Sequence, residues 1–249
     1  YAGQPADVDR VREIVGGRDI KIIQDAAHSL GSMSINRPVG AIADITTFSF
    51  FATKNITTGE GGAISSTNKE ILNNAKEYAR QGIVRDPKRF VLPVDTSVHQ
   101  EVHEFSLNYR LTDFQCALGI SQLRKLEQFK RRRQEIREQY VSLLPDNSQV
   151  KTIKQLPGND PTWHLFPILV DKDKRSHVIN FMRGQDISVQ VNYIPAYWHP
   201  AFDKTEYPMG LCPNSEEFYK REISLPIHVG LSSKDVDFVV KTLLSALGI

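Results

Sequence analysis

Cysteine, an excess of one charge sign and long apolar runs are all scarce in this chain. Only two of its 249 residues are cysteines, too few for a disulfide framework, and we expect Cys116 in the core and Cys212 in a loop. The formal net charge of +2 gives no global field that would attract nucleic acid or an acidic membrane. No apolar run reaches the roughly 18 residues that a membrane span needs, and the first residues are polar rather than a secretory signal. We therefore expect a cytoplasmic protein with neither nucleic-acid nor membrane partners.

The length and composition are those of a globular protein with a large core. Hydrophobic residues make up 40% of the chain, which is enough to bury a sizeable interior. The length suits one large domain or two unequal ones.

Lys54 is informative because of the segments around it. A lone lysine in a polar loop is nearly always a solvated surface charge. Here a strand-like run, residues 47–52, ends just before the lysine, and a glycine-containing loop, residues 57–62, follows it. Upstream, the apolar run 20–23 is followed by Asp25, so a carboxylate lies just past a predicted buried strand. An acid and a lysine at the carboxyl ends of strands in one α/β sheet form the pair that a pyridoxal phosphate site needs.

The chemistry of that cofactor explains why these residue types are required. Pyridoxal phosphate accepts electrons only while its ring nitrogen stays protonated, so a carboxylate must face that nitrogen, and Asp25 is the candidate. Lys54 is the candidate for the Schiff base and, once freed, for moving the proton between substrate and cofactor. That role needs a lysine with a lowered pKa, which burial beside a cationic cofactor supplies.

Strand and helix patterns alternate through the first half of the chain. Residues 45–50 are rich in β-branched and aromatic residues, and residues 62–66 follow as a second strand. A helix is predicted over residues 69–80, capped by Thr67 or Asn68 and stopped at Gly82. Its inner side should carry Ile71, Leu72, Ala75, Tyr78 and Ala79. Residues 82–106 lack periodicity and are expected to form a long excursion.

The longest predicted helix covers residues 113–144. Thr112 and Gln115 make a capping box at its start, and Asp113 lies where the helix dipole favours an acid. Its buried stripe should comprise Ala117, Ile120, Leu123, Phe129, Ile136, Tyr140 and Leu143. The basic run 130–133 is interpreted as a solvated helix face in preference to a nucleotide site.

Residues 145–148 predict a boundary between two domains. The first, residues 1–144, would hold the cofactor, and the second, residues 145–249, would be a small α/β domain. In it we expect strands at 164–170 and 188–192, a helix at 176–183, and a last helix capped by Ser232 with Asp235.

Five segments resemble the DegT/DnrJ/StrS family of nucleotide-sugar aminotransferases, which are fold-type I pyridoxal phosphate enzymes. They are residues 1–7 (YAGQPAD), the Asp25 and Lys54 segments, residues 107–119 (LNYRLTDFQCALG) and residues 222–226 (EISLP). The resemblance runs nearly from end to end. It implies an α/β, aspartate-aminotransferase-like fold, with part of a mixed-sheet large domain and a small C-terminal domain.

The resemblance also implies roles for individual residues. Asp25 should pair with the pyridine nitrogen, and His28, where many members carry Gln, should contact the ring's phenolic oxygen. Ser49 should hold the cofactor phosphate. Asn108 should reach the phosphate of the partner subunit's cofactor, which implies a homodimer with shared active sites. Tyr193 and Arg110 are the expected substrate contacts.

Residues 190–193 and 216–226 are similar to the 4-aminotransferase of the pseudaminic acid pathway. That enzyme aminates a UDP-linked 4-keto-6-deoxy-N-acetylhexosamine with glutamate, giving 2-oxoglutarate, for cell-surface glycan biosynthesis. It usually has His where this chain has Asn192, so a perosamine-type or other keto-sugar aminotransferase stays open.

Family members carry a further amino-terminal segment with phosphate-binding and ring-stacking residues, so we expect the chain to be a fragment. Two alternatives follow: a non-catalytic remnant that acts as a binding or assembly module, and a regulator that has lost turnover. The presence of both Asp25 and Lys54 favours catalysis.

Two further segments leave alternatives open. His99 and His103 have a spacing that could bind a metal on a helix, but no third ligand is evident, and loop residues are the preferred interpretation. Residues 192–200 are rich in aromatic residues and proline, and burial and substrate contact are equally compatible with them.

Overall fold

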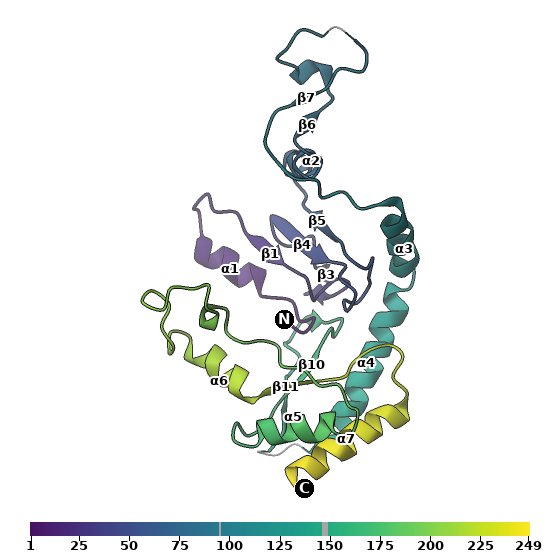
Figure 1. The fold of residues 1–249 in the computed structure, drawn as a ribbon, viewed down its shortest axis with the longest axis vertical. Helices are drawn as coiled ribbons and strands as arrows, with labels where there is room; N and C mark the ends of the chain where they lie inside the picture. The colour runs from purple at the N-terminus through teal and green to yellow at the C-terminus, as the bar shows by residue number, and fades with distance from the viewer. Residues whose placement is uncertain (95, 146–148) are drawn as a thin grey trace. The chain divides into compact units, whose positions relative to one another are not determined.

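The computed structural model describes residues 1–94, 96–145 and 149–249 (Figure 1). The chain forms two compact units. We call Pro5–Leu126 the N-terminal unit, and Tyr1–Gln4 together with Glu127–Ile249 the C-terminal unit. No helix among the described residues is long and apolar enough to cross a bilayer.

A three-stranded mixed sheet forms the centre of the N-terminal unit. Strands β1 (Ile23–Asp25) and β4 (Ile45–Ser49) run parallel, and β5 (Gly62–Ser65) pairs antiparallel with β4. The strands predicted at 45–50 and 62–66 are therefore confirmed. Helix α1 (Val8–Val15) is capped by Asp7 and buries Val8 with Ile42 and Ala43. The short strands β2 (Met33–Ser34) and β3 (Arg37–Pro38) pair antiparallel.

Helix α2 (Lys69–Tyr78) confirms the predicted helix and its cap. The Asn68 side chain accepts hydrogen bonds from the N–H groups of Glu70 (2.8 Å) and Ile71 (3.3 Å). The expected inner face is not buried, however: Tyr78 is exposed, and Leu72, Ala75 and Tyr78 line a cavity of about 1030 Å³. The apolar stripe is present, but within the N-terminal unit it faces this cavity.

The excursion after α2 contains a short hairpin. Strands β6 (Ile83–Val84) and β7 (Glu101–Val102) pair antiparallel, with the 3₁₀ helix η1 (Pro87–Arg89) between them. Gly82 begins the excursion with φ of 66°, and a Cβ there would lie 2.0 Å from the carbonyl oxygen of Glu104. Only glycine fits this position without moving the backbone.

The predicted helix over residues 113–144 is wrong as a single element. The structure has α3 (Asp113–Leu123) and α4 (Leu126–Leu143), separated by a tight turn in which Lys125 N–H donates to the Gln122 carbonyl. The capping box of Thr112 and Gln115 is confirmed. In α4, Ile136 and Tyr140 are buried as predicted, but Leu143 is exposed.

The α3 half of the predicted stripe is also wrong. No residue of α3 is buried, Ile120 and Leu123 are exposed, and so is Cys116, which was expected in the core. The apolar residues of α3 therefore face outward in the N-terminal unit, while those of α4 enter the core of the C-terminal unit. Cys212 is also exposed.

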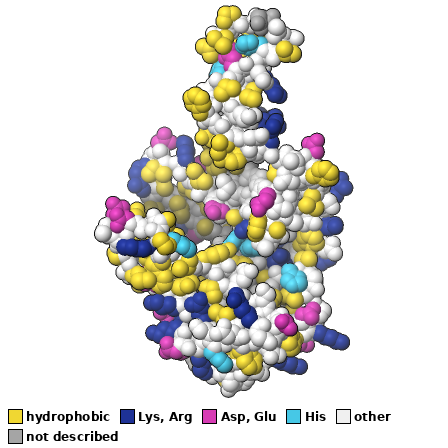
Figure 2. Space-filling view, in the orientation of Figure 1, with side chains coloured by type: hydrophobic (Ala, Val, Ile, Leu, Met, Phe, Trp, Pro, Cys, Tyr) yellow, Lys and Arg dark blue, Asp and Glu magenta, His cyan; other side chains and the backbone are white. Residues whose placement is uncertain are grey.

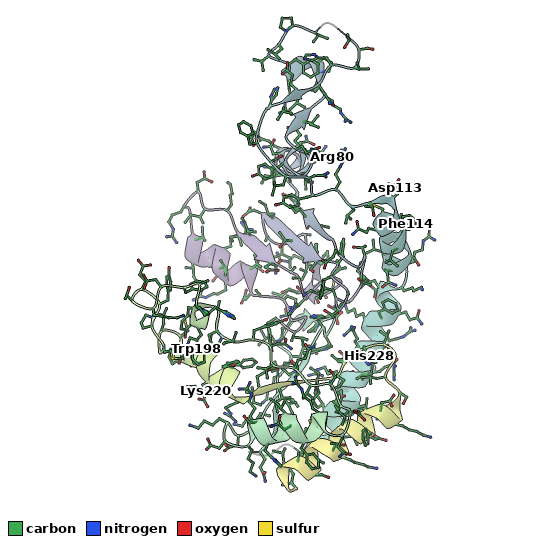
Figure 3. All side chains as sticks on the ribbon, in the orientation of Figure 1. Arg80, Asp113, Phe114, Trp198, Lys220 and His228 are labelled. Carbon is green, nitrogen blue, oxygen red and sulfur yellow. The ribbon has the colours of Figure 1, made fainter. Side chains whose placement is uncertain are left out.

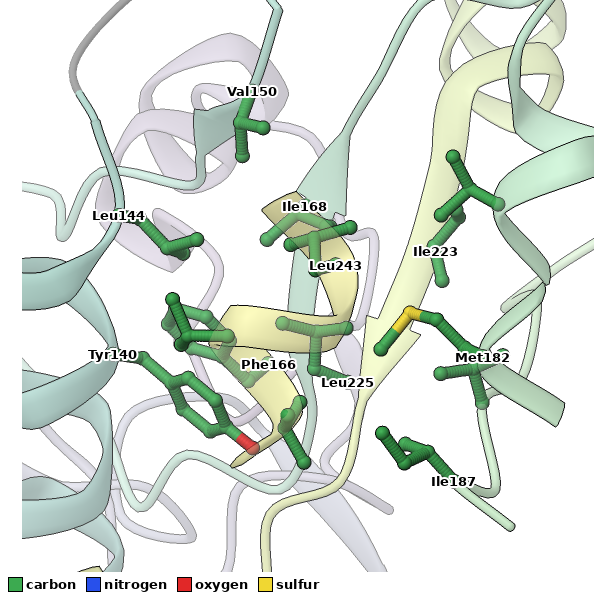
Figure 4. Close-up of a cluster of buried hydrophobic side chains, with 14 of the residues drawn as sticks. Tyr140, Leu144, Val150, Phe166, Ile168, Met182, Ile187, Ile223, Leu225 and Leu243 are labelled. Carbon is green, nitrogen blue, oxygen red and sulfur yellow. The ribbon is translucent and has the colours of Figure 1, made fainter. Parts of the chain in front are cut away.

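The C-terminal unit is built on an antiparallel sheet in the order β11 (Glu222–Leu225), β10 (Phe166–Leu169), β8 (Lys151–Thr152). Helices α5 (Arg175–Arg183) and α7 (Ser233–Leu247) contribute Met182 and Leu243 to its core (Figure 4). The capping box at Ser232 and Asp235 is confirmed. The remaining elements are β9 (Asn159–Asp160), η2 (Ala196–Trp198) and α6 (Pro213–Arg221).

Two expectations for this part of the chain change. Residues 188–192 form no strand, only an isolated bridge between Gln190 and Ser224. In the basic run, Arg133 is buried rather than solvated, and it donates to the carbonyls of Trp163, His164 and Ile227. Burial lowers the pKa of Arg133 to about 10. By their contacts, the two units divide between Leu126 and Glu127, at the start of α4. The domain boundary predicted at residues 145–148 stays a prediction, and residues 146–148 lie outside the described residues.

Candidate active site

Asp25 and Ser49 lie where two parallel strands end. Asp25 is the last residue of β1 and Ser49 the last residue of β4. The strands are in register at Asp25 and Thr47, and the next N–H along, that of Ala26, donates to the Thr47 carbonyl at 2.8 Å. Their carboxyl ends therefore meet at one edge of the sheet, as the sequence predicts. The strand itself differs from the prediction of a buried strand over 20–23, because β1 begins at Ile23, which is exposed, and includes Asp25.

The Asp25 carboxylate is exposed and held by its own backbone. Oδ1 accepts a hydrogen bond from the Ala27 N–H at 2.9 Å. Among the described residues, no hydrogen bond occupies Oδ2. The hydrogen bond at Oδ1 thus fixes the Asp25 side chain, and Oδ2 can accept a hydrogen bond from a ligand.

Lys54 lies in a closed loop that follows β4. The N–H of Phe50 donates to the Gly61 carbonyl at 2.8 Å, and the N–H of Thr58 returns to the Phe50 carbonyl at 2.9 Å. A Cβ at Gly61 would lie 2.4 Å from Thr58 Oγ1, so the loop can close this tightly only with glycine there. The loop holds Lys54 at the same strand edge as Asp25.

The charges of Lys54, His28 and Asp25 influence one another. Burial lowers the pKa of Lys54, and the Asp25 carboxylate opposes that shift. Burial and the positive charge of Lys54 lower the pKa of His28 to about 4, again against Asp25. The structure therefore brings these three predicted residues together. His28 is neutral near pH 7, and Lys54 loses its proton more easily than an ordinary lysine.

Ser49 completes this group. Its half-buried hydroxyl oxygen accepts a hydrogen bond from the Phe51 N–H at 3.4 Å. The hydroxyl proton stays free to be donated to an anion beside the strand end.

Asn108 and Arg110 form a separate pair in the N-terminal unit. Arg110 Nε donates to Asn108 Oδ1 at 3.1 Å, and Asn108 pairs with Arg80 in an isolated antiparallel bridge. Among the described residues, no hydrogen bond or ion pair joins Asn108 or Arg110 to Asp25, Ser49 or Lys54. Their predicted roles stay predictions.

Tyr193 belongs to the C-terminal unit, where its side chain is 55% exposed. The residue before it is fixed by a buried carboxylate: Asn192 N–H donates to Glu222 Oε2 at 2.7 Å, and Asn192 Nδ2 donates to Ser224 Oγ at 2.9 Å. Ser224 Oγ in turn donates to Glu222 Oε1 at 2.5 Å. The sequence resemblance at residues 222–226 assigns no role to Glu222. An acidic residue within an apolar strand is the sequence signal that could have indicated this structural role.

The two alternatives for residues 192–200 apply to different side chains. Tyr197 is buried, and its hydroxyl donates to Glu216 Oε1 at 2.5 Å. Trp198 packs edge-on against Tyr219, with ring centroids 5.5 Å apart. Tyr193 is exposed and can contact a ligand. The structure therefore shows burial for Tyr197, and substrate contact by Tyr193 stays a prediction.

His99 and His103 both contact one carboxylate. His99 Nε2 lies 3.2 Å from Glu101 Oε1, and His103 Nε2 lies 2.7 Å from Glu101 Oε2. Within the described residues no group of three or more candidate ligands could hold a metal ion. The two histidines therefore contact the Glu101 carboxylate, a residue that the sequence analysis did not identify.

Asn55 is a second residue that sequence reasoning missed. It is buried next to Lys54, and among the described residues neither Oδ1 nor Nδ2 has a hydrogen-bond partner. The cavity of about 1030 Å³ beside α2, by contrast, is lined by neither Asp25 nor Lys54. The candidate reactive groups therefore lie at the strand ends and not in this cavity.

Comparison with known proteins gives consistent matches. Residues 1–244 match the profile of the DegT/DnrJ/EryC1/StrS aminotransferase family. The chain is 39% identical over 246 residues to an uncharacterized protein of Methanocaldococcus jannaschii, covering 96% of this chain and 63% of that protein. It is 35% identical over 250 residues to the UDP-4-amino-4,6-dideoxy-N-acetyl-beta-L-altrosamine transaminase of Campylobacter jejuni, covering 99% of this chain and 64% of that enzyme.

A solved structure agrees with the sequence matches. Helicobacter pylori PseC, an aminotransferase involved in the biosynthesis of pseudoaminic acid, matches with a TM-score of 0.90 at 28% identity. The match covers 100% of this chain and 65% of that one. The chain thus spans a little under two thirds of the length of these proteins.

Proposed function

The chain belongs to the DegT/DnrJ/EryC1/StrS aminotransferase family, and from this membership we propose that the protein is a pyridoxal-phosphate-dependent aminotransferase acting on a nucleotide-linked keto-sugar. The predicted fold class, α/β of fold-type I, is confirmed by the solved relatives. One observation carries the proposal: Lys54, with a pKa lowered by burial, lies with Asp25 at the carboxyl ends of β1 and β4.

The groups at this edge fit pyridoxal phosphate on chemical grounds. Asp25 offers a carboxylate oxygen that can hold a ring nitrogen in its protonated state. The Ser49 hydroxyl can donate to a phosphate, and the neutral His28 ring can hydrogen-bond a phenolic oxygen. When bound, the cofactor supplies the electron sink for amino-group transfer.

Lys54 performs the proton transfer in this proposal. Because burial lowers the pKa of Lys54, its Nζ is more readily neutral and can accept a proton from the substrate carbon that bears the nitrogen. Asp25 limits that shift, so the amine stays basic enough to take the proton and to return it. The loop closed between Phe50 and Gly61 holds Nζ in place during both transfers.

Glutamate is the proposed amino donor, and a UDP-linked 4-keto-6-deoxy sugar is the proposed acceptor. The names of the Campylobacter and Helicobacter relatives support an acceptor of this class. Asn192, where the pseudaminic-type enzyme usually has His, keeps a perosamine-type or other keto-sugar as the alternative acceptor. Tyr193 and Arg110 are the proposed substrate contacts.

The proposed protein is a homodimer with shared active sites, in which Asn108 contacts the partner subunit's cofactor phosphate. We also propose that residues 1–144 belong to the cofactor-binding large domain and residues 145–249 to the small domain. Mixing Asn108→Ala chains with Lys54→Ala chains should restore activity in some heterodimers, because one of their two sites is intact. No recovery in verified heterodimers would argue against shared sites.

Borohydride reduction in saturating pyridoxal phosphate, followed by peptide mass spectrometry, tests the central assignment. The adduct should form on Lys54, persist in the control variant Lys69→Ala, and decrease when glutamate is added before reduction. Asp25→Asn should keep the adduct but slow the response to glutamate by at least about 100-fold, because the amide cannot hold the ring nitrogen protonated. Adducts spread over other lysines in wild type would overturn the proposal.

A further inference from the structure

A second cavity in the N-terminal unit is lined by an excess of cations. Its volume is about 420 Å³, and it lies between the end of α2, the start of the excursion and Arg110. Five basic side chains line it: Lys76, Arg80, Arg85, Arg89 and Arg110. Arg80 lies two residues past the end of α2 (Figure 3). Figure 2 shows Lys and Arg side chains along one side of this part of the molecule.

The carboxylates at the cavity do not balance these charges. Glu77 and Asp86 are the only acidic residues among those that line the cavity, which leaves three positive charges in excess. Glu77 is already engaged by Arg89, through a 3.0 Å hydrogen bond from Nη2 and a second, shorter one from Nη1. Asp86 caps η1 by accepting the Lys88 N–H at 3.0 Å.

No carboxylate among the described residues pairs with the other four cations, Lys76, Arg80, Arg85 and Arg110. Arg85 donates to the amide oxygen of Gln100 at 3.2 Å, and Arg110 donates to that of Asn108 at 3.1 Å, so both meet neutral acceptors. The side chains of Lys76 and Arg80 make no hydrogen bond or ion pair with any described residue. Like charges that line one cavity repel one another, and an anion between them reduces that repulsion.

The ligand chemistry follows from the donors. Guanidinium groups present paired N–H donors that match the oxygens of phosphate, and a lysine adds a compact charge. The hydrogen bond to Asn108 and the bridge between Asn108 and Arg80 hold two of the guanidinium-bearing residues at the cavity.

We propose that this cavity binds an oxyanion of the phosphate class, with Lys76, Arg80 and Arg110 as its direct contacts. The site does not depend on the chemistry of Lys54. Two sources can supply the anion: the diphosphate of a nucleotide or the phosphate of a cofactor. The nucleotide is the source if the proposed keto-sugar acceptor is right, and only this choice of source rests on the proposed function.

Calorimetric titration of the chain with inorganic pyrophosphate, UDP and 4-deoxypyridoxine phosphate tests the site. Pyrophosphate should bind, and added salt should weaken its binding. The pair Lys76→Ala/Arg80→Ala should lower the affinity by at least about tenfold, since two charge-assisted contacts are lost. The control pair Lys69→Ala/Arg124→Ala, which removes the same charge from exposed positions outside the cavity, should bind as wild type does.

The titrations also separate the two sources and the two proposals. A loss of UDP binding in the cavity variant identifies the nucleotide, and a loss of 4-deoxypyridoxine phosphate binding identifies the cofactor. Equal binding by the cavity variant and wild type, or an equal loss in the control pair, would overturn the site. The Lys54 adduct reports on the proposed activity independently of either result.

A measurement on the wild-type chain avoids any effect of substitution on folding. Phenylglyoxal modifies accessible guanidinium groups, and peptide mass spectrometry follows the reaction at Arg80. Pyrophosphate should slow modification of Arg80 by about tenfold while leaving Arg124 unaffected. Modification of Arg80 at the same rate with and without pyrophosphate would contradict the proposal.

Discussion

At the scale of single residues, the proposed chemistry depends on the charges at the ends of β1 and β4. Burial makes Lys54 and His28 easier to deprotonate, and Asp25 opposes both shifts. A lysine and a histidine that are both cationic would repel each other here, whereas the pKa of about 4 keeps His28 neutral near pH 7. Lys54 is then the only cation of the three, and Asp25 is its counter-charge.

His28 should make the free energy of unfolding depend on pH. Its pKa falls from 6.5 to about 4 on folding, so between these values the unfolded chain binds a proton that the folded chain does not. Stability from this residue is therefore present above pH 6.5 and lost as the pH falls toward 4. The full shift corresponds to about 3 kcal/mol, and solvent screening of this half-buried ring reduces the expected effect to about 1–2 kcal/mol.

Urea unfolding of wild type and His28→Gln at pH 7 and pH 5 measures this effect. The wild type should lose more stability than the variant between the two pH values, because glutamine does not titrate. His177→Gln, which replaces an exposed histidine of α5, serves as the control. Identical pH dependence in wild type and His28→Gln would show that the ring is not held neutral.

Glu222 should stabilise the segment that carries Tyr193. Its side chain is 0% exposed and accepts hydrogen bonds from Asn192 N–H and Ser224 Oγ; burial, opposed by these donors, raises the pKa of Glu222. Glu222→Leu leaves both donors buried without a partner and should cost about 2–4 kcal/mol, whereas Glu222→Gln, which still accepts from Asn192, should cost about 1 kcal/mol. Urea unfolding compares them with Glu217→Leu at an exposed position; equal stability of all three variants would contradict this role.

At the scale of elements, features set by neighbouring residues were predicted correctly, whereas features set by tertiary contacts were not. The caps at Asn68, Thr112 and Ser232 were right because a capping side chain and the N–H groups that donate to it lie within three residues of each other. The division of residues 113–144 into α3 and α4 was missed because apolar periodicity continues across the turn at Lys125. Residues 188–192 have strand-like composition but pair with β11 only at Gln190.

The same difference between local signals and tertiary contacts explains which parts of the candidate site could be predicted. Asp25 and Lys54 could be predicted because both follow strand patterns, and parallel strands bring their ends together. Glu101 could not be predicted, because its partners Val91, Leu92, His99 and His103 meet only in the folded excursion. The cavity beside Arg80 was missed for the same reason, since Arg110 joins the cations of residues 76–89 only in the folded chain.

The excursion should depend on Glu101. Burial alone would raise the pKa of this carboxyl, but the N–H groups of Val91 and Leu92 and the ring of His103 lower it to about 2. Stability from Glu101 is thus present above the ordinary value of 4.5 and lost only as the pH falls toward 2. Glu101→Ala should speed amide hydrogen exchange at Val91 and Leu92 by at least about tenfold, because both N–H groups lose their acceptor.

Hydrogen exchange with peptide-level mass spectrometry at pH 7 checks the Glu101 prediction. Glu104→Ala removes an exposed carboxylate three residues further along the chain and should leave the exchange unchanged. Exchange at Val91 and Leu92 that is as slow in Glu101→Ala as in wild type would mean that the excursion is held by other contacts.

At the scale of the whole molecule, the two units differ in how much apolar surface they bury. The C-terminal unit has a core that draws on α4, α5, α7 and its sheet (Figure 4). The buried cluster within the N-terminal unit consists of Val8, Ile42 and Ala43. Large apolar side chains of that unit are exposed instead, including Phe105 at 100% and Phe114 at 91%. Composition predicted a sizeable core but could not show that one unit holds most of it.

The described chain should therefore associate through its N-terminal unit. In the order β1-β4-β5, the two outer strands each have one edge without a described partner, and they carry Ile23, 65% exposed, and Ile64, 49% exposed. Unpaired edges that carry apolar side chains favour pairing with another chain, and a lysine at such an edge opposes it. Sedimentation velocity over a concentration series should show reversible association that Ile23→Lys/Ile64→Lys weakens. The pair Leu156→Lys/Val229→Lys, at exposed positions of the C-terminal unit, should associate as wild type does. A monomer at every concentration, or equal weakening by both pairs, would place the association elsewhere than at these strands.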